Sequence, residues 1–72
     1  MWNNGTFKTR NIRIQVTNRH IENPGVWVCH VRELGWSCVS LGIPDESTIE
    51  DAQIEAMAMV RHHLHILIAE LS

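Results

Sequence analysis

The last third of the chain, from Thr48 to Leu71, contains neither glycine nor proline. This stretch predicts a single helix of about six turns, because the two residues that most often end a helix are missing from it. Ser47-Thr48-Ile49-Glu50 has the spacing of a capping box, so we expect the helix to begin at Ser47. The rest of the 72-residue chain must then cover one side of this helix.

The apolar residues of this helix change their distribution along its length. In the first half they recur at spacings of three and four, which predicts a face that packs on a sheet: Ile49, Ala52, Ala56 and Val60. Beyond Met57 they occur all round the helix, and a small sheet cannot bury them all. We therefore expect a partner, most simply a second copy of the chain, with a dimer interface made by Met57, Leu64, Ile68 and Leu71.

Three segments before the helix have strand character. Residues 11–17 alternate polar and β-branched side chains, and residues 26–31 and 36–41 are rich in β-branched and aromatic ones. Asn23-Pro24-Gly25 and the segment 32–35 mark the turns between them. Residues 1–9 are expected to fray. The predicted fold class is α+β, a three-stranded antiparallel sheet packed by one long C-terminal helix (β-β-β-α), in a single domain that spans residues 1–72.

Composition and charge restrict the class of protein. The longest apolar run is far shorter than the ~20 residues that a membrane-spanning helix needs, and the N-terminus lacks the pattern of a signal peptide, so the expected location is cytoplasmic. Residues 1–32 carry five basic residues and one acidic residue, whereas residues 33–72 carry one basic and seven acidic residues. The net charge of −2 disfavours nucleic-acid binding. The acidic half either suits a basic partner or is only a solvated surface.

The residues that most often carry chemistry do not form a recognisable motif. His62 and His65 are one helical turn apart, with His63 beside them, but no cysteine or carboxylate at helical spacing completes a metal site. His30 lies in the middle of a strand, without a nucleophile motif around it. We therefore expect no metal, no cofactor and no enzymatic activity.

The two cysteines, Cys29 and Cys38, fall nearly opposite each other across the second hairpin. A disulfide between them would be strained, and a cytoplasmic location argues against it. The simplest interpretation is that both are small buried hydrophobic residues.

Three segments resemble the N-terminal domain of the HicB antitoxins and their small relatives: residues 25–28, residues 31–42 and the segment Ser47-Thr48-Ile49-Glu50-Asp51-Ala52. The chain departs from that family at Arg32 and at Gly35-Trp36, where the family has proline and Pro-Gly. The resemblance implies a partial RNase H-like scaffold, self-association and binding to a small basic RNA-cleaving toxin of the HicA kind. Family members continue into a DNA-binding segment, which this sequence does not include, so operator binding is not expected here.

These observations together predict a non-catalytic protein-binding module. Its expected partner is a small basic toxin, which it neutralises as an antitoxin does, and the residues expected to bind this partner are Asp45, Glu46, Glu50, Asp51, Glu55 and Trp36. The alternative is a free-standing regulatory protein or phage anti-defence inhibitor on the same scaffold. An RNA-binding module that uses Trp27, Trp36 and the N-terminal basic residues is a third possibility.

Overall fold

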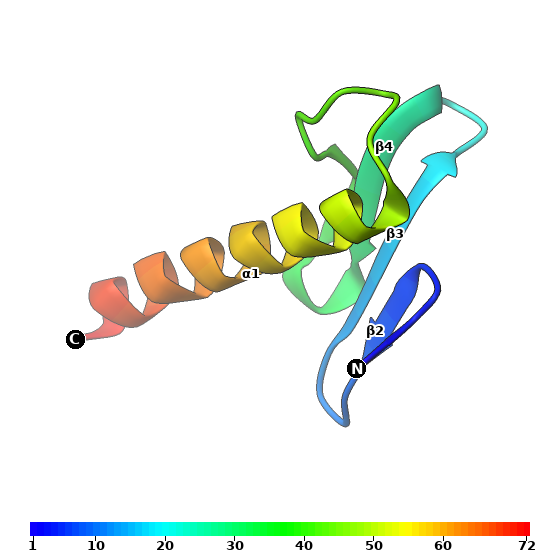
Figure 1. Ribbon diagram of the computed structural model, residues 1–72. Helices are drawn as coiled ribbons and strands as arrows, with labels where there is room; N and C mark the ends of the chain where they lie inside the picture. Colours follow the sequence, from blue (N-terminus) through cyan, green and yellow to red (C-terminus); the bar gives the residue numbers. More distant parts are fainter.

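The computed structural model describes residues 1–72 as one antiparallel sheet crossed by one helix (Figure 1). The five strands form a simple meander in the order β1-β2-β3-β4-β5, and a short 3₁₀ helix, η1, lies between β4 and β5. The elements are β1 (Trp2–Asn3), β2 (Thr6–Lys8), β3 (Arg13–Arg19), β4 (Pro24–Val31), η1 (Arg32–Leu34), β5 (Trp36–Ser40) and α1 (Ile49–Leu71). The prediction of an α+β fold with an antiparallel sheet and a C-terminal helix is confirmed.

The prediction of three strands is wrong, because the sheet has five. Residues 1–9, which were expected to fray, contain the hairpin β1–β2, and this hairpin pairs with β3. Trp2 and Phe7 pack together with ring centroids 5.5 Å apart, and the side chain of Gln53 in α1 donates a hydrogen bond to the carbonyl of Asn4 at 2.6 Å. The aromatic pair within the hairpin and the hydrogen bond from the distant Gln53, rather than any local alternation, hold the hairpin in place.

Gly5, in the β1–β2 turn, allows a close approach of this hairpin to β3. Its carbonyl accepts a hydrogen bond from the Val16 amide at 2.8 Å, and a Cβ at this position would lie 2.6 Å from the Val16 carbonyl oxygen. No side chain fits in that space. A glycine is therefore required where the turn meets the sheet.

The helix begins one residue later than the sequence predicted. Thr48, not Ser47, is the N-cap: its hydroxyl accepts a hydrogen bond from the Asp51 amide at 3.2 Å, and the Asp51 carboxylate accepts one from the Thr48 amide. Ser47 instead belongs to the preceding turn, where its carbonyl accepts a hydrogen bond from the Trp27 indole at 2.9 Å. Asp51 therefore has the capping role predicted for Glu50.

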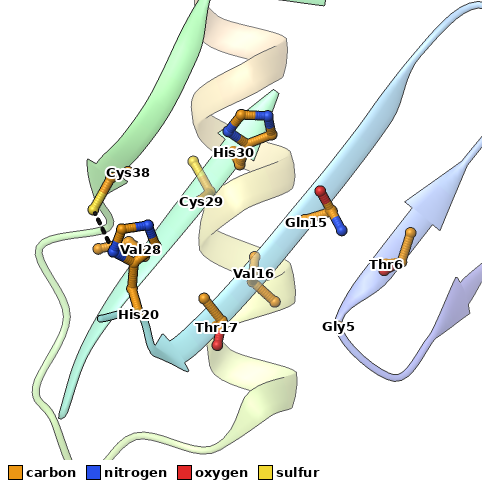
Figure 2. Close-up of a pocket in the computed structure, with 10 residues that line it drawn as sticks. All are labelled: Gly5, Thr6, Gln15, Val16, Thr17, His20, Val28, Cys29, His30 and Cys38. Carbon is orange, nitrogen blue, oxygen red and sulfur yellow. Dashed lines mark hydrogen bonds between the residues drawn. The ribbon is translucent and has the colours of Figure 1, made fainter. Parts of the chain in front are cut away.

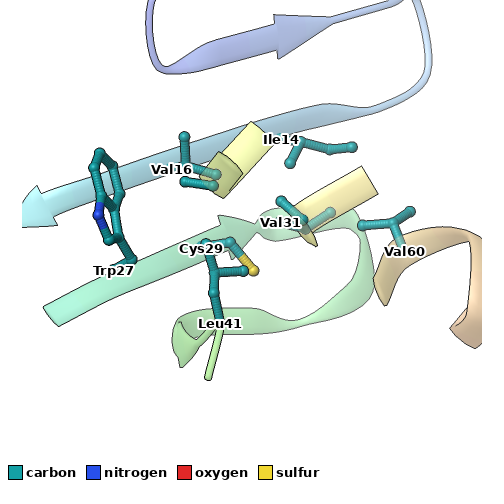
Figure 3. Close-up of a cluster of buried hydrophobic side chains, with 9 residues drawn as sticks. Ile14, Val16, Trp27, Cys29, Val31, Leu41 and Val60 are labelled. Atoms are coloured by element: carbon teal, nitrogen blue, oxygen red, sulfur yellow. The ribbon is translucent and has the colours of Figure 1, made fainter. Parts of the chain in front are cut away.

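The core lies between α1 and one face of the sheet (Figure 3). Alternate residues of β3 and β4 point towards α1, and two alanines on the helix let its backbone approach them closely. The fully or nearly fully buried residues of this cluster are Ile14, Val16, Trp27, Cys29, Val31, Leu41, Ala52, Ala56 and Val60. None of the helices combines the length and apolar character needed to cross a membrane.

Candidate functional site

The acidic residues predicted to bind a partner gather at the N-terminal end of α1 and in the loop before it. Four of them are exposed, and Glu55 is half-buried. The carboxylate of Asp51 is already used in the helix cap. The loop and the first two turns therefore present an acidic end of the molecule, formed by Asp45, Glu46, Glu50, Asp51 and Glu55.

Trp36, which was predicted to belong to the same binding surface, lies elsewhere. Its ring packs against His63 with centroids 5.3 Å apart and planes inclined at 60°. His63 follows Glu50 by thirteen residues along α1, which corresponds to about 20 Å of helix. Trp36 and the acidic end are therefore separate features.

The C-terminal end of α1 extends past the sheet, as the orange and red turns in Figure 1 show. Every residue after His63 is exposed. The exposed fractions of the apolar side chains are 38% for Leu64, 37% for Leu67, 64% for Ile68 and 88% for Leu71. Of the predicted interface residues, Leu64, Ile68 and Leu71 lie in this projecting end, whereas Met57 lines a groove beside Trp2.

The apolar stripe that faces the sheet continues into the projecting end. Ala52, Ala56 and Val60 are buried by the sheet, and Leu64, Leu67 and Leu71 follow on the same face at spacings of four, three and four residues. The sheet thus ends before the stripe does. A contiguous apolar surface left in this way is typical of a protein–protein contact.

The face of the sheet away from α1 is open and more polar. It contains a pocket of about 340 Å³ that runs from β2 to β5 (Figure 2). Its lining residues come from four strands, the β1–β2 turn and the β3–β4 loop: Gly5, Thr6, Gln15, Val16, Thr17, His20, Val28, Cys29, His30 and Cys38. Nothing in the fold covers this face as α1 covers the other.

At one end of this pocket, the β3–β4 loop and β5 bring together several polar side chains. Cys38 Sγ lies 3.6 Å from His20 Nδ1 and accepts a hydrogen bond from Asn23 Nδ2 at 3.2 Å. His20 Nδ1 also accepts a hydrogen bond from the Glu22 amide at 3.2 Å. The Glu22 carboxylate lies close by as well, since one side-chain ligand atom from each of His20, Glu22 and Cys38 lies within 4.8 Å of the other two.

A β-bulge places Cys38 in this cluster. Val31 pairs with Trp36 and Cys29 with Val39, so that Ser37 and Cys38 together face the single residue His30. Cys38 adopts a left-handed backbone conformation, with φ 53°. That conformation costs a non-glycine residue about 1–3 kcal/mol, and such strain concentrates at functional positions.

The two cysteines lie nearly opposite each other, as predicted, but the prediction that both are buried is wrong for Cys38. Cys29 is opposite Val39, is completely buried in the core, and is free. Burial raises the pKa of the Cys29 thiol to about 11. Cys38 is also free but only half-buried, at the edge of the open pocket. Only Cys38 is placed to bind or react with something from solution.

Sequence reasoning missed this cluster because its members lie eighteen residues apart and meet only through the bulge. The one local signal is His20-Ile21-Glu22 in a turn, a spacing that brings two ligand types to the same short loop. The sequence pattern instead pointed to the histidines of α1 as the possible metal ligands, and the structure brings no third ligand close to them.

No family model, curated protein or solved structure matches this chain. The geometry alone offers three surfaces: the acidic end of α1, its apolar projecting end, and the open pocket with its His20–Cys38 cluster.

Proposed function

We propose that this protein is a non-catalytic protein-binding module that works as a homodimer in the cytoplasm. Its partner would be a small basic RNA-cleaving protein of the HicA kind, which it neutralises as an antitoxin does. The observation that carries this proposal is the division of α1 into an exposed acidic end and an exposed apolar end. An apolar end suits a permanent contact, and an acidic end suits a basic partner.

A second copy fits the projecting end when the two helices run antiparallel. If the twofold axis passes between His65 and Ile66, Leu64 of each copy lies opposite Leu67 of the other. Val60 then lies near the partner's Leu71. The overlap covers residues 60–71, about 18 Å of helix, and buries the stripe that the sheet leaves open.

The acidic end then remains free in each copy. Asp45, Glu46 and Glu50 are exposed, and Glu50 has no role in the helix cap. A surface that binds RNA is basic, and an acidic protein that covers this surface excludes the RNA by competition. The resemblance of the hairpin and the helix start to HicB antitoxins supports a partner of this class.

Sedimentation at micromolar concentration tests the dimer. The wild-type protein should sediment at twice the mass of the 8.3 kDa chain, and Leu67→Glu should give monomers because it places a charge in the apolar contact. Ile54→Glu is the matched control, since Ile54 is 70% exposed on the same helix but outside the overlap. A folded wild-type monomer at high concentration would refute the dimer, and equal dissociation by both variants would refute the interface at the projecting end.

Association kinetics with a purified HicA-like toxin test the partner. Glu46→Lys combined with Glu50→Lys should slow association in low salt and leave the circular dichroism spectrum unchanged. The corresponding double glutamine variant should give an intermediate rate. The proposal fails if the wild-type protein does not inhibit RNA cleavage by the toxin, and the acidic end has no role if the charge reversal leaves the rate unchanged.

A further inference from the structure

We infer that His20, Glu22 and Cys38 form a zinc site that connects the β3–β4 loop to β5. The three residues offer an imidazole nitrogen, a carboxylate oxygen and a sulfur, and their ligand atoms lie within 4.8 Å of one another. Each of these ligand types binds zinc in proteins, and a thiolate favours zinc over magnesium or calcium.

The distance between sulfur and nitrogen fits tetrahedral zinc. Bonds of about 2.3 Å to sulfur and 2.0–2.1 Å to nitrogen, at a tetrahedral angle, separate the two atoms by about 3.6 Å. Cys38 Sγ and His20 Nδ1 are 3.6 Å apart. The two ligands contributed by separate elements are therefore already at the required separation.

The third ligand needs only a small side-chain movement. Tetrahedral zinc places a carboxylate oxygen about 3.4–3.6 Å from the other two ligand atoms. Glu22 is exposed and follows His20 by two residues in the same loop, so rotation of its side chain can close the remaining distance. Three protein ligands leave the fourth position to water.

The hydrogen bonds around the cluster are those that support a metal-bound thiolate. Asn23 Nδ2 donates to Cys38 Sγ at 3.2 Å, and this contact can persist when zinc is bound, orienting the sulfur and stabilising its negative charge. Zinc would replace the Glu22 amide as the partner of the His20 Nδ1 lone pair. That amide lies in an exposed loop, where water can satisfy it.

The position of the site also explains the strained backbone of Cys38. The bulge in β5 and the left-handed conformation of Cys38 direct its sulfur to His20 and Asn23 rather than along the strand. In Figure 2 the dashed line joins Cys38 to His20 at the edge of the pocket, while His30 points elsewhere. A bound ion would fix the loop and the edge strand in a domain with a small core.

Spectroscopy with cobalt(II), a substitute for zinc, tests the inference on the reduced, metal-free protein. Cobalt should bind one per chain, with a thiolate-to-cobalt charge-transfer band in the near ultraviolet, and zinc chloride should displace it. Calorimetry of zinc binding in buffers of different ionisation enthalpy should show release of a proton, because the thiol binds metal as the thiolate.

Three sets of variants locate the site. Cys38→Ser, which keeps the size of the side chain, should abolish the charge-transfer band, and His20→Gln and Glu22→Gln should weaken zinc binding. Asn23→Ala should weaken it by about 10- to 100-fold, the usual effect of removing a residue that supports a ligand. The double variant His62→Gln and His65→Gln is the control and should bind cobalt like the wild-type protein. Cobalt binding without a thiolate band, or binding lost only in this control, would overturn the inference.

Discussion

Trp36 and His63 pack with ring centroids 5.3 Å apart, at the point where the sheet stops supporting α1. Every helix residue after His63 is exposed, so this pair marks the boundary between the part of α1 that belongs to the core and the part that projects. Trp36 supports the boundary from β5, opposite Val31.

Replacement of Trp36 by alanine should lower the free energy of unfolding by about 2 kcal/mol. The loss should be smaller than the roughly 3–5 kcal/mol typical of a fully buried tryptophan, because Trp36 is only half-buried. Urea unfolding measures it, with Trp36→Phe as the control that keeps an aromatic contact to His63. Equal stability of the alanine variant and the wild-type protein would show that the contact does not support α1.

Much of the architecture follows from local patterns in the sequence. The alternation in residues 11–17 and the absence of glycine and proline after Thr48 correspond to β3 and α1. The turn expected at Asn23-Pro24-Gly25 is displaced, because Pro24 and Gly25 begin β4 and the β3–β4 loop is formed by residues 20–23. The N-terminal hairpin does not follow in this way. Its strands are two and three residues long, and they are held by Gln53, about fifty residues away, and by the close contact of Gly5 with Val16.

The candidate sites also differ in whether local patterns in the sequence predict them. The acidic end and the apolar stripe are properties of one continuous helix, so spacing alone predicts them. The cluster of His20, Glu22 and Cys38 depends on a bulge and on a left-handed residue, and no pattern of spacing reports either. The placement of Trp36 also depends on which face of β5 it occupies.

Gly5→Ala tests whether the N-terminal hairpin belongs to the cooperative fold. Its Cβ would lie 2.6 Å from the Val16 carbonyl oxygen, so the hairpin must move and the free energy of unfolding should fall by about 1–3 kcal/mol. Asn3→Ala, at an exposed position in the same hairpin, should have little effect. If both variants unfold at the same urea concentration as the wild-type protein, the hairpin does not contribute to global stability.

Glu33 should contribute to the loss of stability in acid. Hydrogen bonds from its own backbone amide and from the Arg13 amide, followed by the charges of Arg32 and Arg13, hold the pKa of the Glu33 carboxyl below its ordinary value. A carboxyl with a lower pKa in the folded state stabilises the protein above its unfolded pKa, about 4.3, and this contribution is lost as the pH falls through the folded pKa. Thermal unfolding of Glu33→Gln should therefore show a smaller decrease in melting temperature below about pH 4.3 than the wild-type protein. Parallel pH profiles would exclude the effect.

The two thiols should differ in reactivity towards a disulfide reagent at about pH 8 under native conditions. Cys38 is accessible at the pocket edge and should react first, whereas Cys29 is completely buried and burial raises the pKa of its thiol to about 11, so little thiolate is present. Cys38→Ser should remove the fast phase, and Cys29→Ala should leave it intact. Unfolding in urea should make both thiols of the wild-type protein react.

Zinc added before the reagent should slow the fast phase if the ion binds the Cys38 thiolate, so the same assay connects the accessibility of Cys38 to the metal site. Rapid reaction of Cys29 in the folded protein would contradict the buried position that the core assigns to it.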